Sequence, residues 1–209
     1  MKHSLEAQRG NTRRAILDAL AEVIVECGGF GFSVQQVADR AGVTHRTVYN
    51  HFPTREALND AFAVYVEDEL AERLGGAPAD PSSLGDIARV VEEAYGAFEA
   101  GEVHIRAYVM VMIASRGPAR VARDRTSAIE ALVRSEAAVP PPLTPRGLTA
   151  AVRIFASSTG WHLLTEHLGL SSKEAATTAI WAIRTLLEAA AREGPSHETP
   201  HDEPGGEGA

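Results

Sequence analysis

Hydrophobic residues recur along most of this chain at the spacing of an α-helix. In residues 11–27 one helical face carries Ile16, Leu20, Val23, Ile24 and Cys27. Eight further periodic segments follow, at residues 34–40, 44–50, 54–74, 82–100, 103–115, 118–138, 144–168 and 171–193. No segment shows the strict alternation of a strand, so the pattern predicts an all-α fold of about nine helices.

Glycine, proline and acidic residues divide the chain into regions. A Gly-, Ala- and Pro-rich linker spans residues 75–81, and residues 195–209 are rich in Pro, Gly and acidic side chains. We expect an N-terminal helix-turn-helix domain over residues 1–55, a helical domain over residues 56–193 and a disordered acidic tail over residues 194–209.

Two helical segments of the second domain have distinctive patterns. Residues 107–114 are apolar on every side, which predicts a central buried helix. The segments 144–168 and 171–193 flank Gly169, and we expect them to form two long helices of an αα-hairpin.

The chemistry is concentrated in residues 33–52. Ser33 and Gln36 match a capping box, and Phe32 and Val37 match the hydrophobic staple that accompanies it. Gly42 suits a turn with positive φ, and the residue that follows Val43 is a good N-cap. Two short helices joined by such a turn form a helix-turn-helix.

The outer face of the second short helix is polar, as expected of a helix that fits the major groove of DNA. His45, Arg46 and Asn50 could reach base edges, whereas Thr47, Tyr49 and His51 could reach phosphates. The start of the next helix offers free N–H groups to a further phosphate. The predicted DNA-binding residues are Ser33, Thr44, His45, Arg46, Thr47, Tyr49, Asn50, His51 and Arg55. The alternative is a small helical subdomain with a solvated polar surface.

Charge is distributed unevenly along the chain. The net charge is −8, yet residues 1–55 carry seven basic and five acidic side chains. A positive balance confined to the N-terminal end is compatible with nucleic-acid binding there.

Several segments of this region match a known pattern: RAILDA at residues 14–19, SVQQVADRAGV at 33–43, THRTVYNHF at 44–52 and TREAL at 54–58. Over residues 11–62 the chain resembles TetR-family transcriptional regulators. It departs from them at Phe32, where the family often has Thr, and at Arg55, where it often has Lys. The resemblance implies a homodimer, a double-stranded operator with two half-sites, repression, and a C-terminal domain that binds a small-molecule inducer.

An inducer would need a cavity in the second domain. The resemblance favours a cavity between the helices whose apolar faces carry aromatic and Met side chains, Trp161 among them. The predicted ligand-binding residues are Tyr95, Phe98, Tyr108, Met110, Met112, Phe155 and His162. Met side chains suit an adaptable apolar cavity, and Tyr108 and His162 could supply its polar contacts. This favours a hydrophobic or aromatic ligand, although such a stripe also forms plain core.

The hairpin of residues 144–193 has a second apolar face. Two such hairpins related by a twofold axis would form a four-helix bundle. The predicted dimer residues are Ile154, Trp161, Leu164, Ile180, Trp181 and Leu187. The alternative is a hairpin fully buried within a monomer.

The sequence offers little for catalysis or metal binding. It contains neither H-E-x-x-H nor G-x-S-x-G, and its single cysteine excludes an internal disulfide and a cysteine-based zinc site. His162 and His167 are five residues apart, which places them on different helical faces. We therefore expect no enzyme, no metal and no cofactor. Without an apolar signal core or membrane span, we expect a cytoplasmic, nucleoid-associated bacterial protein.

Two functions fit these features. The first is a DNA-binding transcriptional regulator, a repressor that leaves its operator when a hydrophobic or aromatic ligand binds. The second is a ligand-binding or scaffold protein that retains the fold without binding DNA.

Overall fold

The computed structural model describes residues 2–29, 31–75, 82–114, 120–137, 139 and 141–192. Over those residues the chain forms ten α-helices and one π-helical turn, which confirms the predicted all-α fold. The expected acidic tail at residues 194–209 lies outside the described residues, and the expected domain boundary at residue 55 stays a prediction. None of the described helices is both long and apolar enough to cross a membrane.

The first four helices follow the sequence pattern closely. They are α1 (Lys2–Glu26), α2 (Val34–Arg40), α3 (His45–His51) and α4 (Arg55–Arg73). The caps, turns and apolar spacing placed α2, α3 and α4 within one residue of these bounds. By contrast, α1 begins nine residues before the predicted start at residue 11.

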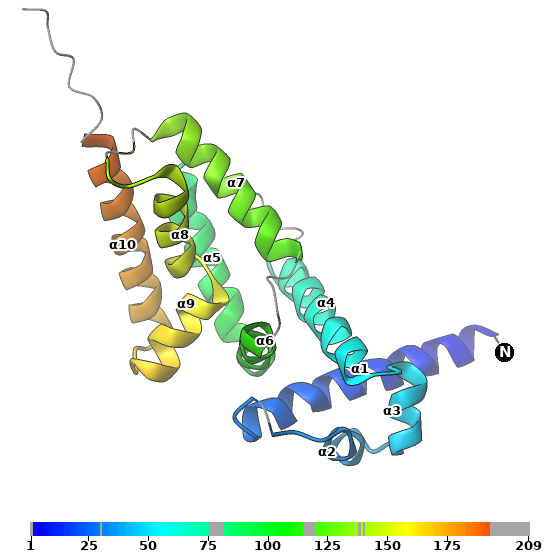
Figure 1. Cartoon of the computed structure of the whole chain (residues 1–209). Helices are drawn as coiled ribbons and strands as arrows, with labels where there is room; N and C mark the ends of the chain where they lie inside the picture. Colours follow the sequence, from blue (N-terminus) through cyan, green and yellow to red (C-terminus); the bar gives the residue numbers. More distant parts are fainter. Residues whose placement is uncertain are drawn as a thin grey trace, which may run out of the picture.

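The rest of the chain is a helical bundle. It comprises α5 (Asp86–Ala100), α6 (Glu102–Ala114), α7 (Arg120–Glu136), α8 (Pro145–Phe155), α9 (Ser158–His162), the π-helical turn η1 (Leu163–His167) and α10 (Ser172–Arg192). In this bundle α10 packs along α5, and α7 packs along α8. Figure 1 shows α1, α2 and α3 at one end of the molecule and the bundle at the other, with α4 running between them.

The segment 144–168 is not the single long helix that its periodicity predicted. It ends as α8 at Phe155, and α9 begins after Ser157, whose hydroxyl accepts a hydrogen bond from the N–H of Gly160. Ser157 also donates to the carbonyl of Ile154, and the absence of a side chain at Gly160 lets the two segments meet closely. The break therefore depends on a side-chain cap and a close backbone approach rather than on proline.

The apolar helix α6 is central, but it is not buried on every side. Its buried residues are Ile105, Ala107, Val109 and Val111, whereas Val103 and Ile113 are exposed. It packs mainly against α1 and α4, at the junction between the N-terminal helices and the bundle. The position of α6 therefore links both ends of the molecule.

Candidate nucleic-acid interface and ligand cavity

The helix-turn-helix is built from short-range hydrogen bonds that the sequence predicted. At the start of α2, Gln36 N–H donates to Ser33 Oγ at 3.2 Å and Ser33 N–H donates to Gln36 Oε1 at 2.7 Å. Gly42 adopts φ +67°, a conformation that L side chains rarely adopt. Thr44 then caps α3 by accepting the N–H of Thr47 at 3.1 Å.

Apolar packing holds the two short helices together. Val37 and Ala38 of α2 and Val48 of α3 are all buried. They contact the core that Ile16 and Leu20 of α1 help to form. Because the apolar side of α3 is buried there, its polar residues face solvent.

The exposed face of α3 contains most of the predicted DNA-binding residues. Arg46 and Asn50 are exposed, Tyr49 is 41% exposed, and Thr47 is half-buried. The rings of His45 and Tyr49 stack edge to face with their centroids 4.7 Å apart, which fixes their relative position. The hydroxyls of Thr44 and Thr47 lie 2.8 Å apart. The result is a row of hydrogen-bonding groups of the size that a major groove admits.

The C-terminal end of α3 lies against α1. The guanidinium of Arg13 lies 4.5 Å from the centre of the Phe52 ring. His51 is half-buried; burial first, and then the positive charges of Arg9 and Arg13, lower its pKa below its ordinary value near 6.5. At neutral pH it is therefore an uncharged hydrogen-bonding group.

The start of α4 is fixed to the start of α2. Thr54 Oγ1 caps α4 by accepting the N–H of Ala57 at 3.0 Å. The guanidinium of Arg55 lies 3.9 Å from the centre of the Phe32 ring, a cation–π contact that the sequence did not predict. Phe32 directly precedes Ser33, which is exposed. Arg55 and Ser33, both predicted to bind DNA, therefore lie on neighbouring segments.

Four polar side chains join α1, α4 and α6 at the centre of the molecule. His104 of α6 bonds Glu69 of α4 at 2.6 Å, and its other ring nitrogen lies 3.4 Å from Asp18 of α1. The hydroxyl of Tyr65 donates to Asp18 at 2.7 Å, and burial together with that bond raises the pKa of Tyr65. Sequence reasoning missed this cluster because its members are separated by up to 86 residues.

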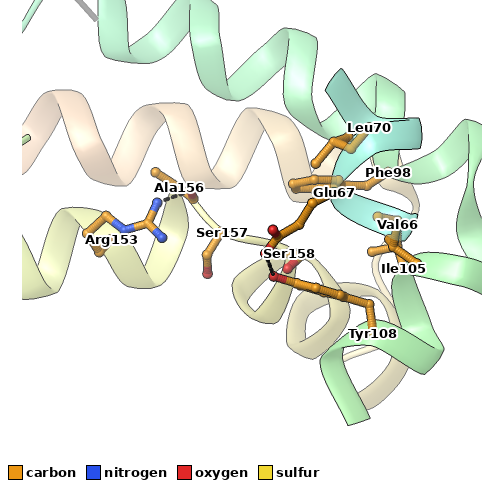
Figure 2. A pocket seen from close by; sticks show the side chains of 10 residues that line it. All are labelled: Val66, Glu67, Leu70, Phe98, Ile105, Tyr108, Arg153, Ala156, Ser157 and Ser158. Atoms are coloured by element: carbon orange, nitrogen blue, oxygen red, sulfur yellow. Dashed lines mark hydrogen bonds between the residues drawn. The ribbon is translucent and has the colours of Figure 1, made fainter. Parts of the chain in front are cut away.

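A cavity opens beside this cluster, between α4 and α6 and the junction of α8 with α9. Counting its open mouth, it encloses about 520 Å³. Its lining residues are Val66, Glu67, Leu70, Phe98, Ile105, Tyr108, Arg153, Ala156, Ser157 and Ser158. Figure 2 shows the carboxylate of Glu67 meeting the hydroxyl of Tyr108 inside it, a hydrogen bond of 2.9 Å. An apolar wall with a few polar groups is typical of small-molecule sites.

The seven predicted ligand-binding residues occupy different places. Phe98 and Tyr108 line the cavity, while the hydroxyl of buried Tyr95 donates to the carbonyl of Phe155 at 2.6 Å. Met110 lies beside the Gly29 turn that follows α1, and Met112 is half-buried. His162 is buried, its Nδ1 atom has no hydrogen-bond partner among the described residues, and burial lowers its pKa. The residues that do not line the cavity are therefore Tyr95, Met110, Met112, Phe155 and His162.

Other lining residues were not predicted as ligand contacts. Arg153, Ser157 and Ser158 reach the cavity because the chain breaks between α8 and α9. The run of Ser157, Ser158 and Gly160 is the local signal that could have indicated the break. Glu67 carries no such signal, because an acidic residue on a long helix is normally solvated.

The predicted dimer residues divide by exposure. Trp161 and Leu164 are buried within the chain, and the indole N–H of Trp161 donates to Ser172 at 3.2 Å. Ile154 is 58% exposed and Trp181 is 67% exposed, whereas Ile180 and Leu187 are half-buried. Large apolar side chains on α8 and α10 are thus left in contact with water.

The N-terminal helices are similar in sequence to those of bacterial regulatory proteins. Residues 16–62 match the family model of "Bacterial regulatory proteins, tetR family". The chain is 29% identical over 69 residues to the "HTH-type transcriptional regulator AlkX" of Mycobacterium tuberculosis. It is 30% identical over 70 residues to the "Nucleoid occlusion factor SlmA" of Pectobacterium carotovorum subsp. carotovorum. Each match spans 33% of this chain, and it covers 33% of the length of AlkX and 35% of the length of SlmA.

Solved structures resemble nearly the whole fold. NalD of Pseudomonas aeruginosa, described as the secondary repressor of the MexAB-OprM multidrug efflux pump, aligns with a TM-score of 0.57 and 24% identity over 84% of this chain and 96% of its own. The TetR family transcriptional regulator PfmR of Thermus thermophilus aligns with a TM-score of 0.58 and 18% identity over 83% and 97%. At these identities the likeness shows a common fold.

Proposed function

We propose that this chain, whose residues 16–62 match the model of the tetR family of bacterial regulatory proteins, is a homodimeric transcriptional repressor that leaves its operator DNA when a small hydrophobic or aromatic ligand binds. The DNA partner, the dimer and the ligand all belong to this proposal.

The observation that carries the proposal is the path of α4. Only three residues separate the end of α3 from the start of this helix, and its residues Val66, Glu67 and Leu70 line the cavity. Eleven to fifteen residues of helix separate Arg55 from that wall, a rigid connection of about 16–22 Å at 1.5 Å per residue. A ligand that displaces this part of α4 also displaces the start of the helix beside α3.

The exposed face of α3 supplies the proposed DNA contacts. We assign base reading to Arg46, His45 and Asn50, because guanidinium, imidazole and amide groups match the hydrogen-bonding edges of bases. We assign phosphate contacts to Tyr49 and Thr47, whose hydroxyls are compact donors.

The cavity supports an apolar ligand with a polar group. Val66, Leu70, Phe98 and Ile105 provide apolar surface, and the Glu67–Tyr108 hydrogen bond provides one polar point on the wall between α4 and α6. A ligand shifts the protein only if it prefers one arrangement of these helices. A ligand that inserts between Glu67 and Tyr108 would favour the arrangement in which α4 and α6 are further apart.

A second copy of the chain would cover the apolar side chains on α8 and α10. Exposed Ile154 and Trp181 are its best-placed contacts. Two recognition helices must lie about 34–36 Å apart to enter successive major grooves, so dimer geometry determines operator affinity.

DNA binding is tested with the full chain and fluorescent duplexes tiled across the DNA upstream of its own gene. Anisotropy titrations at a stated salt concentration should identify one duplex bound at least a hundredfold more tightly than a scrambled duplex. Arg46→Ala should reduce that ratio, whereas Arg89→Ala on distant α5 should leave it unchanged. Equal affinity of the wild type for all duplexes would support the ligand-binding or scaffold alternative.

Ligand coupling is tested with the apolar fluorophore 1-anilinonaphthalene-8-sulfonate. Ala156→Phe fills the cavity and should abolish most fluorophore binding, while Ala150→Phe on the exposed side of α8 should not. A bound fluorophore should weaken operator affinity, and operator should weaken fluorophore affinity by the same factor, typically about 5–150-fold. Unchanged fluorophore affinity in the presence of operator would refute the coupling.

A further inference from the structure

Residues 6–15 of α1 form a helical extension of mostly exposed side chains. The helix starts at Lys2, and between residues 6 and 15 every side chain except that of Thr12 is exposed. A helix that buries no apolar face gains little stability from the fold. Figure 1 shows this part of α1 running beyond α3 towards the N-terminus.

The two halves of α1 differ in charge. Residues 1–17 contain four basic residues and one acidic residue. In the C-terminal half, Glu22 and Glu26 pair with Arg40 of α2, each at 2.6 Å. No such neutralisation occurs at the other end: within the described part of the chain, no carboxylate lies within 4.0 Å of the guanidinium of Arg9 or Arg13.

Arg9 and Arg13 lie on the side of α1 that meets the end of α3. They are one helical turn apart and therefore share a face. Arg13 lies over the ring of Phe52, the residue that follows α3, and both arginines are close enough to His51 to affect its titration. Their positive charge is thus continuous with the polar face of α3.

We propose that Arg9 and Arg13 bind the phosphate backbone of the DNA duplex beside the groove that α3 enters, so that α1 extends the interface. The inference rests on the proposed DNA binding and adds a second contact surface to it. The occupant follows from charge complementarity and from continuity with α3. Such contacts carry no sequence information, so they strengthen binding to every duplex alike.

Salt dependence distinguishes phosphate contacts from other effects. Each phosphate neutralised by a basic side chain contributes about 0.9 to the slope of log affinity against log salt for B-DNA. Loss of two contacts lowers the slope by about 1.8, so between 50 and 200 mM salt the wild type should lose about 12-fold more affinity than the variant.

The experiment compares Arg9→Gln/Arg13→Gln with Arg89→Gln/Arg146→Gln, a pair with the same change in net charge on the exposed surface of α5 and α8. Anisotropy is measured for the full chain on a 30-base-pair duplex of random sequence and on an operator duplex. We expect the first pair to lower the slope by about 1.8 on both duplexes and the second pair to leave it unchanged.

Two further variants separate charge from packing. Arg9→Gln alone removes a side chain with no described packing contact and should lower the slope by about 0.9. Arg13→Lys keeps the charge and should keep the slope, even if the contact with Phe52 changes. Equal slopes for both charge pairs would overturn the proposal while leaving DNA binding intact. A wild type that binds neither duplex would overturn both the proposed function and this extension of it.

Discussion

Substitution of Gly160 by alanine should break the junction between α8 and α9. A Cβ atom at this position would lie well below 3.0 Å from the carbonyl oxygen of Ile154, a separation that real Cβ atoms essentially never show. It would also lie 3.0 Å from the carbonyl carbon of Ile154 and 3.4 Å from Cα of Phe155. Backbone atoms cannot rotate away as a flexible side chain can, so one helix must move.

The cost has two parts. Overpacking of a close contact typically costs about 1–3 kcal/mol. The same carbonyl accepts the hydroxyl of Ser157, which in turn accepts the N–H of Gly160, so displacement also weakens the cap of α9. Loss of an N-cap costs typically about 1 kcal/mol, which gives a total of about 2–4 kcal/mol.

Gly96 provides the matched control. It lies in the interior of α5, is exposed, and a Cβ there would meet nothing within 4 Å. Gly96→Ala should therefore raise the free energy of unfolding by about 0.5–1 kcal/mol through helix propensity. Urea unfolding followed by circular dichroism measures both variants. If Gly160→Ala were as stable as the wild type, the close approach of α8 and α9 would be wrong, and with it the cavity wall at Ser157.

Four further predictions concern the turn before α3, the exposed face of α3, the exposed face of α10 and the buried His162. Gly42→Val should lower the stability of the N-terminal helices by about 1–3 kcal/mol, because φ +67° is strained for a β-branched residue even though the space is open; normal urea unfolding would contradict the turn geometry. Tyr49→Phe should weaken binding to all duplexes by about 1 kcal/mol. Arg46→Ala should instead relax the preference at one base position per half-site, at a cost of about 1–3 kcal/mol there. Equal effects of the two variants on specific and random DNA would contradict the assigned roles. Trp181→Glu changes a residue that is 67% exposed in the single chain, so it should leave the fold intact but yield a monomer by light scattering; an unchanged dimer would place the interface elsewhere. Burial depresses the pKa of His162 in the folded state, so its contribution to stability should be complete above pH 6.5 and be lost as the pH falls through and below 6.5. Between pH 7.5 and 5, the urea midpoint of His162→Leu should therefore fall less than that of the wild type.

Local rules predicted the helix-turn-helix well because its geometry depends on neighbouring residues. Ser33, Gly42 and Thr44 each determine a cap or turn within four residues of themselves, and all three act in the structure as predicted. The extension of α1 was missed because residues 2–10 lack the apolar periodicity that indicates a helix, and residues 6–10 are all exposed.

The cavity between α4, α6 and the α8–α9 junction was harder to predict because it depends on contacts between distant residues. Apolar periodicity indicates that Tyr95, Phe98 and Tyr108 face other helices. It does not determine which of them border a cavity and which pack against neighbouring residues. Tyr95 fills its site by bonding the carbonyl of Phe155, whereas Phe98 and Tyr108 border the cavity. The difference follows from how α8 ends, and that depends on packing against the rest of the bundle.

The contact between α4 and α6 suggests how two separate features act together. Glu67 bonds Tyr108 in the cavity wall, and Glu69, two residues along α4, bonds His104, one turn along α6. Under the proposed mechanism, we expect a ligand that separates Glu67 from Tyr108 to strain the bond between Glu69 and His104 as well. His104 also lies 3.4 Å from Asp18 of α1. The strain would therefore reach α1 as well as α4, the two helices that lie against α3. Because α1 and α4 contribute to a common core, we expect them to move together, which would rotate α3 without unfolding it.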